Sequence, residues 1–246
     1  MDKDYREQLL AAVGNRHSVR RYLPKSIDEA TRRLIDNKIE DLNREGGLHM
    51  QAVYDEPKGF SGFFAYGQFS GVRNYIVVAG SESAPFDRQA DLQSLDERVG
   101  YFGEQFVLYA QSIGLNTCWA GLSYRKVKGT YELSSGEKIR CYIALGYGET
   151  QGVDHKIKTP ADVSNAGADT PGWFLSGVEA ALLAPTAVNQ QKFSFEYRSP
   201  ASEGGTPTVI AKPGLSLVGY TKMDLGITKL HFELGAGGNR FKFVSR

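Results

Sequence analysis

The sequence predicts an α+β fold, in which helices with one apolar face are interspersed with short apolar strands. Two observations support this prediction. From Leu92 to Ile113, apolar residues recur at spacings of three and four, which is the period of a helix. Residues 74–79 and 139–145 are instead short apolar runs of the kind found in buried strands. The 246 residues suffice for one large domain or two small ones.

The N-terminal part of the chain is expected to contain two helices before the first strand. Residues 4–13 form a short helix that ends at Gly14. A second helix begins at Ser26, where Ser26-Ile27-Asp28-Glu29 has the pattern of a capping box. Residues 43–72 are rich in Gly, Phe and Tyr with weak periodicity, which predicts a long loop or short irregular strands. The long helix described above is expected to end at Gly114.

A second set of elements follows a polar connection at residues 149–170, and Thr170-Pro171 is a suitable start for its first helix. The expected elements are a helix over 172–184, a strand over 192–198, turns at 204–205 and 213–214, a helix over about 220–234 and an edge strand over 240–244. A helix, a strand and a long glycine-terminated helix thus recur in the same order. We therefore predict two related halves, residues 1–165 and 166–246.

Charges nearly cancel, with 29 Lys and Arg against 28 Asp and Glu. Proteins that bind nucleic acid or membrane surfaces without sequence preference show a basic excess, so neither partner is expected. No apolar run is long enough for a membrane helix, and the charged N-terminus lacks the apolar segment of a secretory signal. A cytoplasmic protein is the expectation. Cys118 and Cys141 are too few for a disulfide framework, and the histidines lie at no metal-ligand spacing, so no metal is expected.

Four segments carry residues that can bind a ligand. Arg16-His17-Ser18-Val19-Arg20-Arg21-Tyr22 offers guanidinium groups and a hydroxyl that suit a phosphate, although it could equally be a solvated basic loop. Ala184-Pro185-Thr186-Ala187-Val188-Asn189-Gln190-Gln191 offers amides that suit the edge of a heterocycle, or is an ordinary helix exit. Ala120-Gly121 would let backbone N–H groups approach a ligand. Lys156 and Lys158 form a cationic pair, which alone is usually just solvated.

Patterns of other enzyme classes are missing from the sequence. Gly146-Tyr-Gly-Glu-Thr-Gln-Gly152 follows a strand, but its spacing is wrong for a dinucleotide fingerprint and no helix pattern follows it. No G-x-S-x-G segment supports a serine hydrolase. Since no activated side-chain nucleophile is evident, we expect a bound cofactor to supply any difficult chemistry.

Together these segments resemble the motifs of the FMN-dependent nitroreductase family. Residues 16–22 are similar to the family's R-x-S-x-R/K-x-F/Y signature, and residues 184–191 to its A-P-S-x-x-N-x-Q motif. Residues 114–121 resemble its G-L-x-T-x-x-x-G stretch, and residues 143–147 with the basic pair at 156–158 resemble its late strand and basic residues. The resemblance covers most of residues 10–195. It implies a nitroreductase-like mixed or antiparallel sheet flanked by helices.

The order of the motifs departs from ordinary members of that family. There the A-P-S-x-x-N-x-Q motif soon follows the basic signature, and the partner subunit of a homodimer supplies it to the flavin. Here it comes only at residues 184–191. The chain thus resembles a subgroup in which two halves are fused into a pseudo-dimer. This implies one complete site per chain, in a monomer or a weak homodimer. The second half has no counterpart of the basic signature, which argues against a second site.

The resemblance implies cofactor-binding roles and no catalytic side chain. Arg16, Ser18 and the two lysines would hold the FMN phosphate. Arg20 would face the N1–C2=O edge of the ring, where negative charge gathers on reduction. A backbone N–H near Ala120-Gly121 would bond N5, and Thr186 and Asn189 would hold the ribityl chain and ring edge. The full implied set is Arg16, His17, Ser18, Arg20, Ala120, Gly121, Lys156, Lys158, Pro185, Thr186, Ala187 and Asn189.

The implied activity is a ping-pong oxidoreductase that passes hydride from NAD(P)H to FMN and then to a nitroaromatic, quinone or related small-molecule electron acceptor. The aromatic, glycine-rich segment 59–69 could cover the acceptor pocket or simply fill the core. Two other functions stay open. One is a flavin-binding sensor or FMN-handling protein with little turnover, and the other is a structural or interaction protein that keeps the fold without the flavin.

Overall fold

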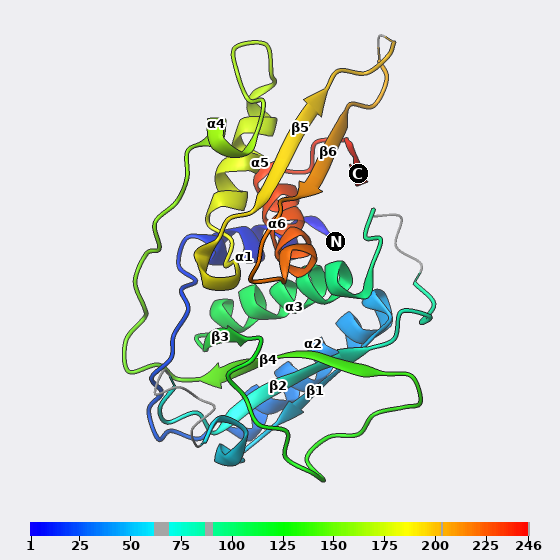
Figure 1. Ribbon diagram of the computed structural model, residues 1–246. Coiled ribbons are helices and arrows are strands. Elements are labelled where there is room, and N and C mark those ends of the chain that lie inside the picture. The colour runs from blue at the N-terminus through cyan, green and yellow to red at the C-terminus, as the bar shows by residue number, and fades with distance from the viewer. Residues whose placement is uncertain (62–68, 87–90, 203, 246) are drawn as a thin grey trace. The chain divides into compact units, whose positions relative to one another are not determined.

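The computed structural model describes residues 1–61, 69–86, 91–202 and 204–245 (Figure 1). The chain forms two compact units, each built from segments that are distant in the sequence. Residues 1–14, 88–104 and 155–246 form the terminal unit, and residues 15–87 and 105–154 form the central unit. The predicted halves, residues 1–165 and 166–246, were defined by their similar order of elements and not by compact packing. That division stays a prediction.

The central unit is built on a four-stranded antiparallel sheet with the order β1-β2-β4-β3. Its strands are β1 (Leu48–Val53), β2 (Asn74–Gly80), β3 (Asn116–Ala120) and β4 (Lys138–Gly146). Every residue of β2 is buried, as a middle strand requires. The two strands predicted from apolar runs are confirmed, and they are the two middle strands, β2 and β4.

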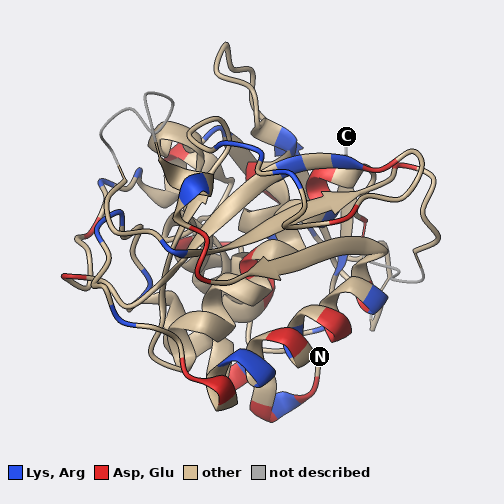
Figure 2. Ribbon diagram, turned by 90° about the horizontal axis from the view of Figure 1, so that it is seen from below, with Lys and Arg blue, Asp and Glu red and all other residues tan. Residues whose placement is uncertain are grey.

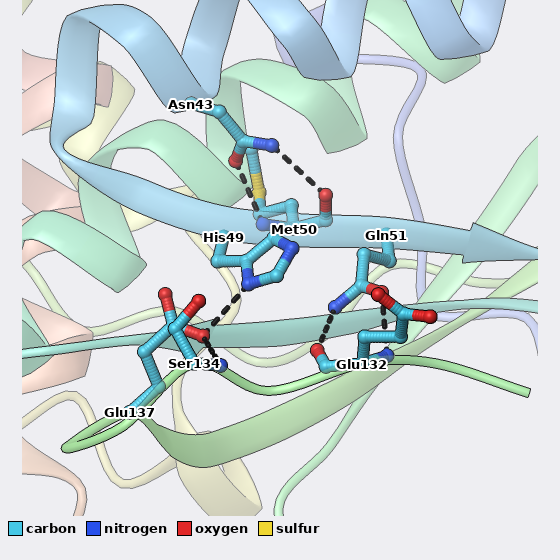
Figure 3. A network of polar contacts seen from close by, with 7 residues as sticks. All are labelled: Asn43, His49, Met50, Gln51, Glu132, Ser134 and Glu137. Carbon is cyan, nitrogen blue, oxygen red and sulfur yellow. Dashed lines mark hydrogen bonds and ion pairs between the residues drawn. The ribbon is translucent and has the colours of Figure 1, made fainter. Parts of the chain in front are cut away.

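Strand β1 directly follows helix α2 (Glu29–Gly46) and packs against it. The left-handed φ of 56° at Gly47 ends the helix. The Asn43 side chain then bonds both the N–H and the carbonyl of Met50, at 2.7 and 2.9 Å (Figure 3). Of the two alternatives expected over 43–72, a long loop or short irregular strands, β1 is a short strand, whereas residues up to Gly46 still belong to α2. A short 3-10 helix, η1 (Pro57–Phe60), follows in the same region.

Two helices begin at other cap residues than predicted. Helix α2 begins after Asp28, whose carboxylate accepts a first-turn backbone N–H at 3.0 Å, and not at Ser26. Helix α5 (Gly172–Leu182) has Pro171 itself as its N-cap residue, and the Thr170 hydroxyl bonds elsewhere. A carboxylate is both a hydrogen-bond acceptor and a charge that the helix N-terminus stabilises, which favours Asp28 over a serine.

The terminal unit combines helices with a three-stranded sheet of order β5-β6-β7. Strands β5 and β6 are antiparallel, β6 and β7 are parallel, and α5 lies beside α6 next to β5 and β6 (Figure 1). Its elements are α1 (Lys3–Val13), α4 (Pro160–Val163), α5, η3 (Ala187–Asn189), β5 (Phe193–Arg198), β6 (Thr208–Pro213), α6 (Thr221–Gly235) and β7 (Lys242–Ser245). The predicted helices, strand 192–198 and the C-terminal edge strand are confirmed, whereas β6 was not predicted.

The predicted long helix is α3 (Leu95–Ser112), which contributes its residues up to Glu104 to the terminal unit. Close packing against it explains part of the glycine content. A Cβ at Gly226 of α6 would collide with the main-chain carbonyl of Glu97 in α3, and one at Gly100 with the carbonyl of Met223. Helices that cross this closely need glycine, because a larger residue would push the two main chains apart.

Charged residues of both signs are interspersed along the chain, in line with its net charge of +1 (Figure 2). No helix in the described part of the chain is long and apolar enough to cross a membrane. Among the residues described, no three His, Cys, Asp or Glu side chains gather as a metal site would require. Cys118 and Cys141 are buried free thiols.

Candidate functional site

In the central unit, the segment Arg16–Tyr22 is extended and fixed by its main chain. Val19 donates its N–H to a carbonyl of β3 at 3.0 Å, and Tyr22 donates to the carbonyl of Ser70 at 3.0 Å. The side chains of Val19 and Tyr22 are buried, whereas Arg20 between them is exposed. The sheet therefore holds this segment in place and leaves the Arg20 guanidinium available to a ligand.

Two glycines that follow β4 make room for this segment. A Cβ at Gly148 would lie 2.8 Å from a methyl group of Val19. Gly152 has a φ of +83°, and a Cβ there would lie 2.5 Å from the Cβ of His17. These glycines allow close packing under the basic segment, and no helix opens directly after β4 in the described residues. The structure thus gives the 146–152 run a packing role, in agreement with its poor match to a dinucleotide fingerprint.

The basic segment converges on Cys118 of β3. Burial raises the pKa of the Cys118 thiol, whereas Arg20, the Ser18 hydroxyl and Arg16 each lower this pKa. Ser18 pairs with Thr117, the residue before Cys118, in a parallel bridge. Arg16 is itself only 3% exposed. A guanidinium in such a site is a strong partner for an anion, because its five donors are rigidly arranged.

The predicted ring contact lies at the end of the same strand. Ala120 is buried and shares a core cluster with Cys118, two residues before it, on the same face of the sheet. Gly121 begins the bend that follows. His17 is half-buried, with its Nε2 3.8 Å from the carboxylate of Asp154. The predicted residues of the central unit thus lie along β3, with Ser18 opposite Thr117 near its start and Ala120 and Gly121 at its end.

In the terminal unit, residues 185–191 form a tight loop between α5 and β5. Three of its residues have a left-handed backbone: Val188, Asn189 and Gln191, with φ of 47°, 55° and 44°. Residues other than glycine rarely adopt this conformation, and where they do, they cluster at ligand and active sites. Pro185, Thr186 and Ala187 are half-buried, and Asn189 is exposed.

Gln191 fastens this loop to the segment that carries the two predicted lysines. Its Oε1 accepts the N–H of Lys158 at 2.9 Å. Its Nε2 donates to the carbonyl of Lys156 at 2.7 Å and to Oδ1 of Asn189 at 2.9 Å. Gln191 is 4% exposed and both of its amide hydrogens are used, so it supports the loop and does not bind a ligand. It belongs to the A-P-T-A-V-N-Q-Q motif but was not among the predicted ligands.

The contacts of Gln191 distinguish the two lysines. The Lys158 ammonium donates to the carbonyl of Gln191 at 2.8 Å. The Lys156 side chain is exposed and has no hydrogen bond or ion pair with the described residues. The Thr186 oxygen accepts the N–H of Gln191 at 3.0 Å, which leaves the hydroxyl proton for another acceptor. Asn189 donates one amide hydrogen to the Lys156 carbonyl at 2.8 Å and keeps the other.

Asp224, in the first turn of α6, holds the other side of the loop and was missed by the sequence analysis. Its Oδ1 accepts the N–H of Ala187 at 3.0 Å, and its Oδ2 accepts Nε2 of Gln190 at 2.6 Å. The residue is 3% exposed. Burial raises the pKa of Asp224 to about 6, although the two hydrogen bonds lower it. No sequence signal marks this aspartate, because it lies far from the motif and looks like any other acidic residue in a first helical turn.

Comparison with known proteins decides the family. A family model described as "Putative TM nitroreductase" matches residues 8–236. The chain belongs to this nitroreductase family. Because nitroreductases are oxidoreductases, the chain belongs to an oxidoreductase family. No curated protein sequence matches the chain.

Solved structures share the nitroreductase fold with this chain. A "putative nitroreductase" from Thermotoga maritima MSB8 has a TM-score of 0.58 and 23% identity, over 92% of this chain and 82% of that one. A nitroreductase-like protein from Streptococcus mutans has a TM-score of 0.50 and 16% identity, over 63% of this chain and 96% of that one. A "putative nitroreductase" from Desulfovibrio desulfuricans, solved in complex with FMN, has a TM-score of 0.49 and 16% identity, over 66% and 96% of the two chains, and does not itself support the fold assignment. The predicted α+β nitroreductase-like fold is confirmed.

In this nitroreductase, the predicted residues fall into two sets, one in each compact unit. Lys156 and Lys158, which were expected to act with the N-terminal half, lie in the same unit as the motif loop. Of the aromatic segment 59–69, residues 62–68 lie outside the described residues, and Phe60 and Phe69 pack edge to face at 4.9 Å. The central set is Arg16, His17, Ser18, Arg20, Ala120 and Gly121; the terminal set is Lys156, Lys158, Pro185, Thr186, Ala187 and Asn189.

Proposed function

We propose that the chain is an FMN-dependent oxidoreductase that takes hydride from NAD(P)H and reduces a nitroaromatic, quinone or related small acceptor in a ping-pong reaction. FMN would supply redox chemistry that none of the chain's own side chains offers. The observation that supports this proposal best is that Arg16, Ser18 and Arg20 all act on the Cys118 thiol of β3, the strand that also carries the buried Ala120.

The donors present in both sets suit the chemistry of FMN. A phosphate dianion needs several cationic or hydroxyl donors, and Arg16, Ser18 and Lys156 are of that kind. Thr186 and Asn189 each keep a hydrogen for an acceptor such as a ribityl oxygen or the ring edge. The remaining proposed contacts are His17, Gly121, Lys158, Pro185 and Ala187.

Arg20 has a tuning role in this proposal. Reduction of the flavin ring places negative charge on its N1–C2=O edge, and a fixed cation at that edge favours the reduced form. Arg20 is exposed while the main chain on either side of it is fixed, so its guanidinium can meet a ligand from a rigid support. No proton transfer by a side chain is required of it.

We further propose one flavin per chain, in a pseudo-dimeric monomer or weak homodimer. The basic signature occurs once in the sequence, at residues 16–22, and the A-P-T-A-V-N-Q-Q motif also occurs once, at residues 184–191. One copy of each motif supports one complete set of ligands.

Neighbouring arginines provide a matched test. Arg20→Gln is expected to weaken FMN binding by about tenfold or to lower the flavin midpoint potential, because a charge-assisted contact is lost. Arg21→Gln removes the same charge next door and should change neither, since successive side chains of an extended segment point to opposite sides. Equal behaviour of the two variants would refute the Arg20 assignment. Steady-state NAD(P)H oxidation with a quinone then separates an enzyme from a flavoprotein with little turnover.

A further inference from the structure

A cavity of about 720 Å³ opens in the terminal unit, bordered by the start of α1, the end of α6 and β7. This volume lies in the range of pockets that take small organic ligands. None of its lining residues takes part in the proposed flavin binding. The residues that line it include three cationic and two aromatic ones: Arg6, Arg240, Lys242, Phe241 and Phe243.

The charge in this cavity is unbalanced. Arg6, Arg240 and Lys242 have no ion pair within the described residues. The acidic side chain of the wall is Glu233, whose carboxylate accepts the Tyr101 hydroxyl at 2.7 Å. Three cations against one carboxylate leave an excess of two positive charges. Like charges held together in a concave site attract an anion.

The main chain itself caps part of the C-terminus of α6. The carbonyl of Phe232 accepts the N–H of Ala236 at 2.9 Å, and that of Leu234 accepts the N–H of Gly237 at 3.1 Å. The carbonyl of Ala236 in turn accepts the N–H of Asn239 at 3.3 Å. These three carbonyls therefore do not depend on the cationic groups for a partner.

A glycine after α6 makes room for Arg6 beside the cavity. Gly238 has a φ of +82°, and a Cβ at this residue would lie 2.9 Å from Cζ and 3.0 Å from Nη2 of Arg6. Glycine adopts this conformation without strain and leaves the space that the guanidinium occupies. A side chain at this position would therefore displace the guanidinium from its place.

The apolar wall is equally fixed. The rings of Phe241 and Phe243 lie edge to face with centroids 5.0 Å apart. Phe241 also stacks on Trp173 at 5.3 Å, and Phe243 adjoins Phe232 of the core at 5.7 Å. Rings anchored in this way offer a planar body an apolar surface without losing side-chain freedom on binding.

We propose that this cavity is a second ligand site, which binds a small aromatic anion through its cationic side chains and its phenyl rings. A carboxylate suits it best, because a guanidinium can bond both carboxylate oxygens at once. The site is separate from the motif loop along α6. Asp224 beside the loop and Glu233 in the cavity are nine residues apart, which is about 13 Å along a helix axis.

Calorimetric titration of the FMN-saturated chain with 1-naphthoate tests this site. We expect saturable binding of one naphthoate per chain, and binding of the neutral analogue 1-naphthylmethanol at least about tenfold weaker, since it lacks the charge-assisted contacts. Inorganic phosphate should bind more weakly than naphthoate, because it has no aromatic body. The absence of saturable binding, or equal binding of the neutral analogue, would overturn the proposal.

Variants identify where the probe binds. Arg240→Gln is expected to weaken naphthoate binding about tenfold, whereas Lys222→Gln, at the exposed opposite end of α6, should not change it. Gly238→Ala should weaken binding in the wild-type chain but add nothing to Arg6→Gln, because both act through the same guanidinium. If Arg20→Gln abolishes binding and Arg240→Gln does not, the probe occupies the flavin site and the cavity is not a ligand site.

Discussion

Replacing Gln191 with methionine perturbs the motif loop at its main support. Methionine keeps the length and approximate volume of glutamine, so the substitution removes polar contacts without leaving a large cavity. Three side-chain hydrogen bonds disappear, to the Lys158 N–H, the Lys156 carbonyl and Asn189 Oδ1. The Lys156 carbonyl keeps the amide of Asn189 at 2.8 Å as a donor. Two polar groups of the loop therefore lose their partner.

The magnitude follows from the burial of this network. A net contribution of about 1 kcal/mol per hydrogen bond gives a destabilisation of about 3 kcal/mol for the three bonds. Gln191 is only 4% exposed, so water cannot easily replace its amide. We also expect FMN affinity to fall by about tenfold or more, because the loop that carries Thr186 and Asn189 loses its attachment.

Urea unfolding followed by far-UV circular dichroism measures this effect, with an unchanged slope showing that the unfolded states are comparable. Gln51→Met is the matched control. Gln51 also makes two main-chain hydrogen bonds, with the carbonyl and N–H of Glu132 at 2.7 and 2.8 Å (Figure 3). These bonds are exposed, so the control should cost less than about 1 kcal/mol. If Gln191→Met costs no more than Gln51→Met, the supporting role of Gln191 is refuted.

Two further predictions concern buried positions of α6. Burial raises the pKa of the Asp224 carboxyl from 3.8 to about 6. Between about pH 4 and 6 this carboxyl is therefore protonated in the folded chain and ionised in the unfolded chain. Raising the pH from about 4 to 7 should therefore lower the free energy of unfolding by about 2 kcal/mol relative to Asp224→Asn, and parallel pH profiles in urea unfolding would contradict this. Gly226→Ala should destabilise the chain by about 2 kcal/mol or more, because the new Cβ meets the carbonyl of Glu97. Gly172→Ala is the control, because a Cβ there meets nothing within 4 Å. Its free energy of unfolding, measured by thermal or urea unfolding, should stay within about 0.5 kcal/mol of wild type. Equal losses in the two variants would exclude tight helix crossing as the cause.

The elements that sequence patterns predicted are those whose own periodicity is strong. Strand β2 is buried on both faces and reads as a continuous apolar run, and α3 keeps its helical spacing over several turns. Strand β1 was predicted only as one of two alternatives, because Leu-His-Met-Gln-Ala-Val mixes polar and apolar residues and directly follows a glycine that ends a helix. Its strand conformation is stabilised by pairing with β2, which no local pattern shows.

The candidate site was predicted as a collection of donors, and the structure shows which of them are already engaged. The motif pointed to Asn189, but the buried amide that organises the loop is Gln191. The cationic pair is unequal, because the Lys158 ammonium bonds the loop carbonyl and the Lys156 side chain stays exposed. The contribution of Asp224 depends on how α6 packs against the loop. Such tertiary contacts cannot be predicted from residue spacing.

Titration of the flavin-free chain with FMN, followed by visible absorbance and equilibrium dialysis, tests most directly whether the proposed ligands hold a single flavin. We expect one FMN per chain at saturation. Arg20→Gln in the central unit and Asn189→Ala in the terminal unit should each weaken that same binding event. No FMN binding, two FMN per chain, or an isotherm unaffected by Asn189→Ala would contradict the proposed site.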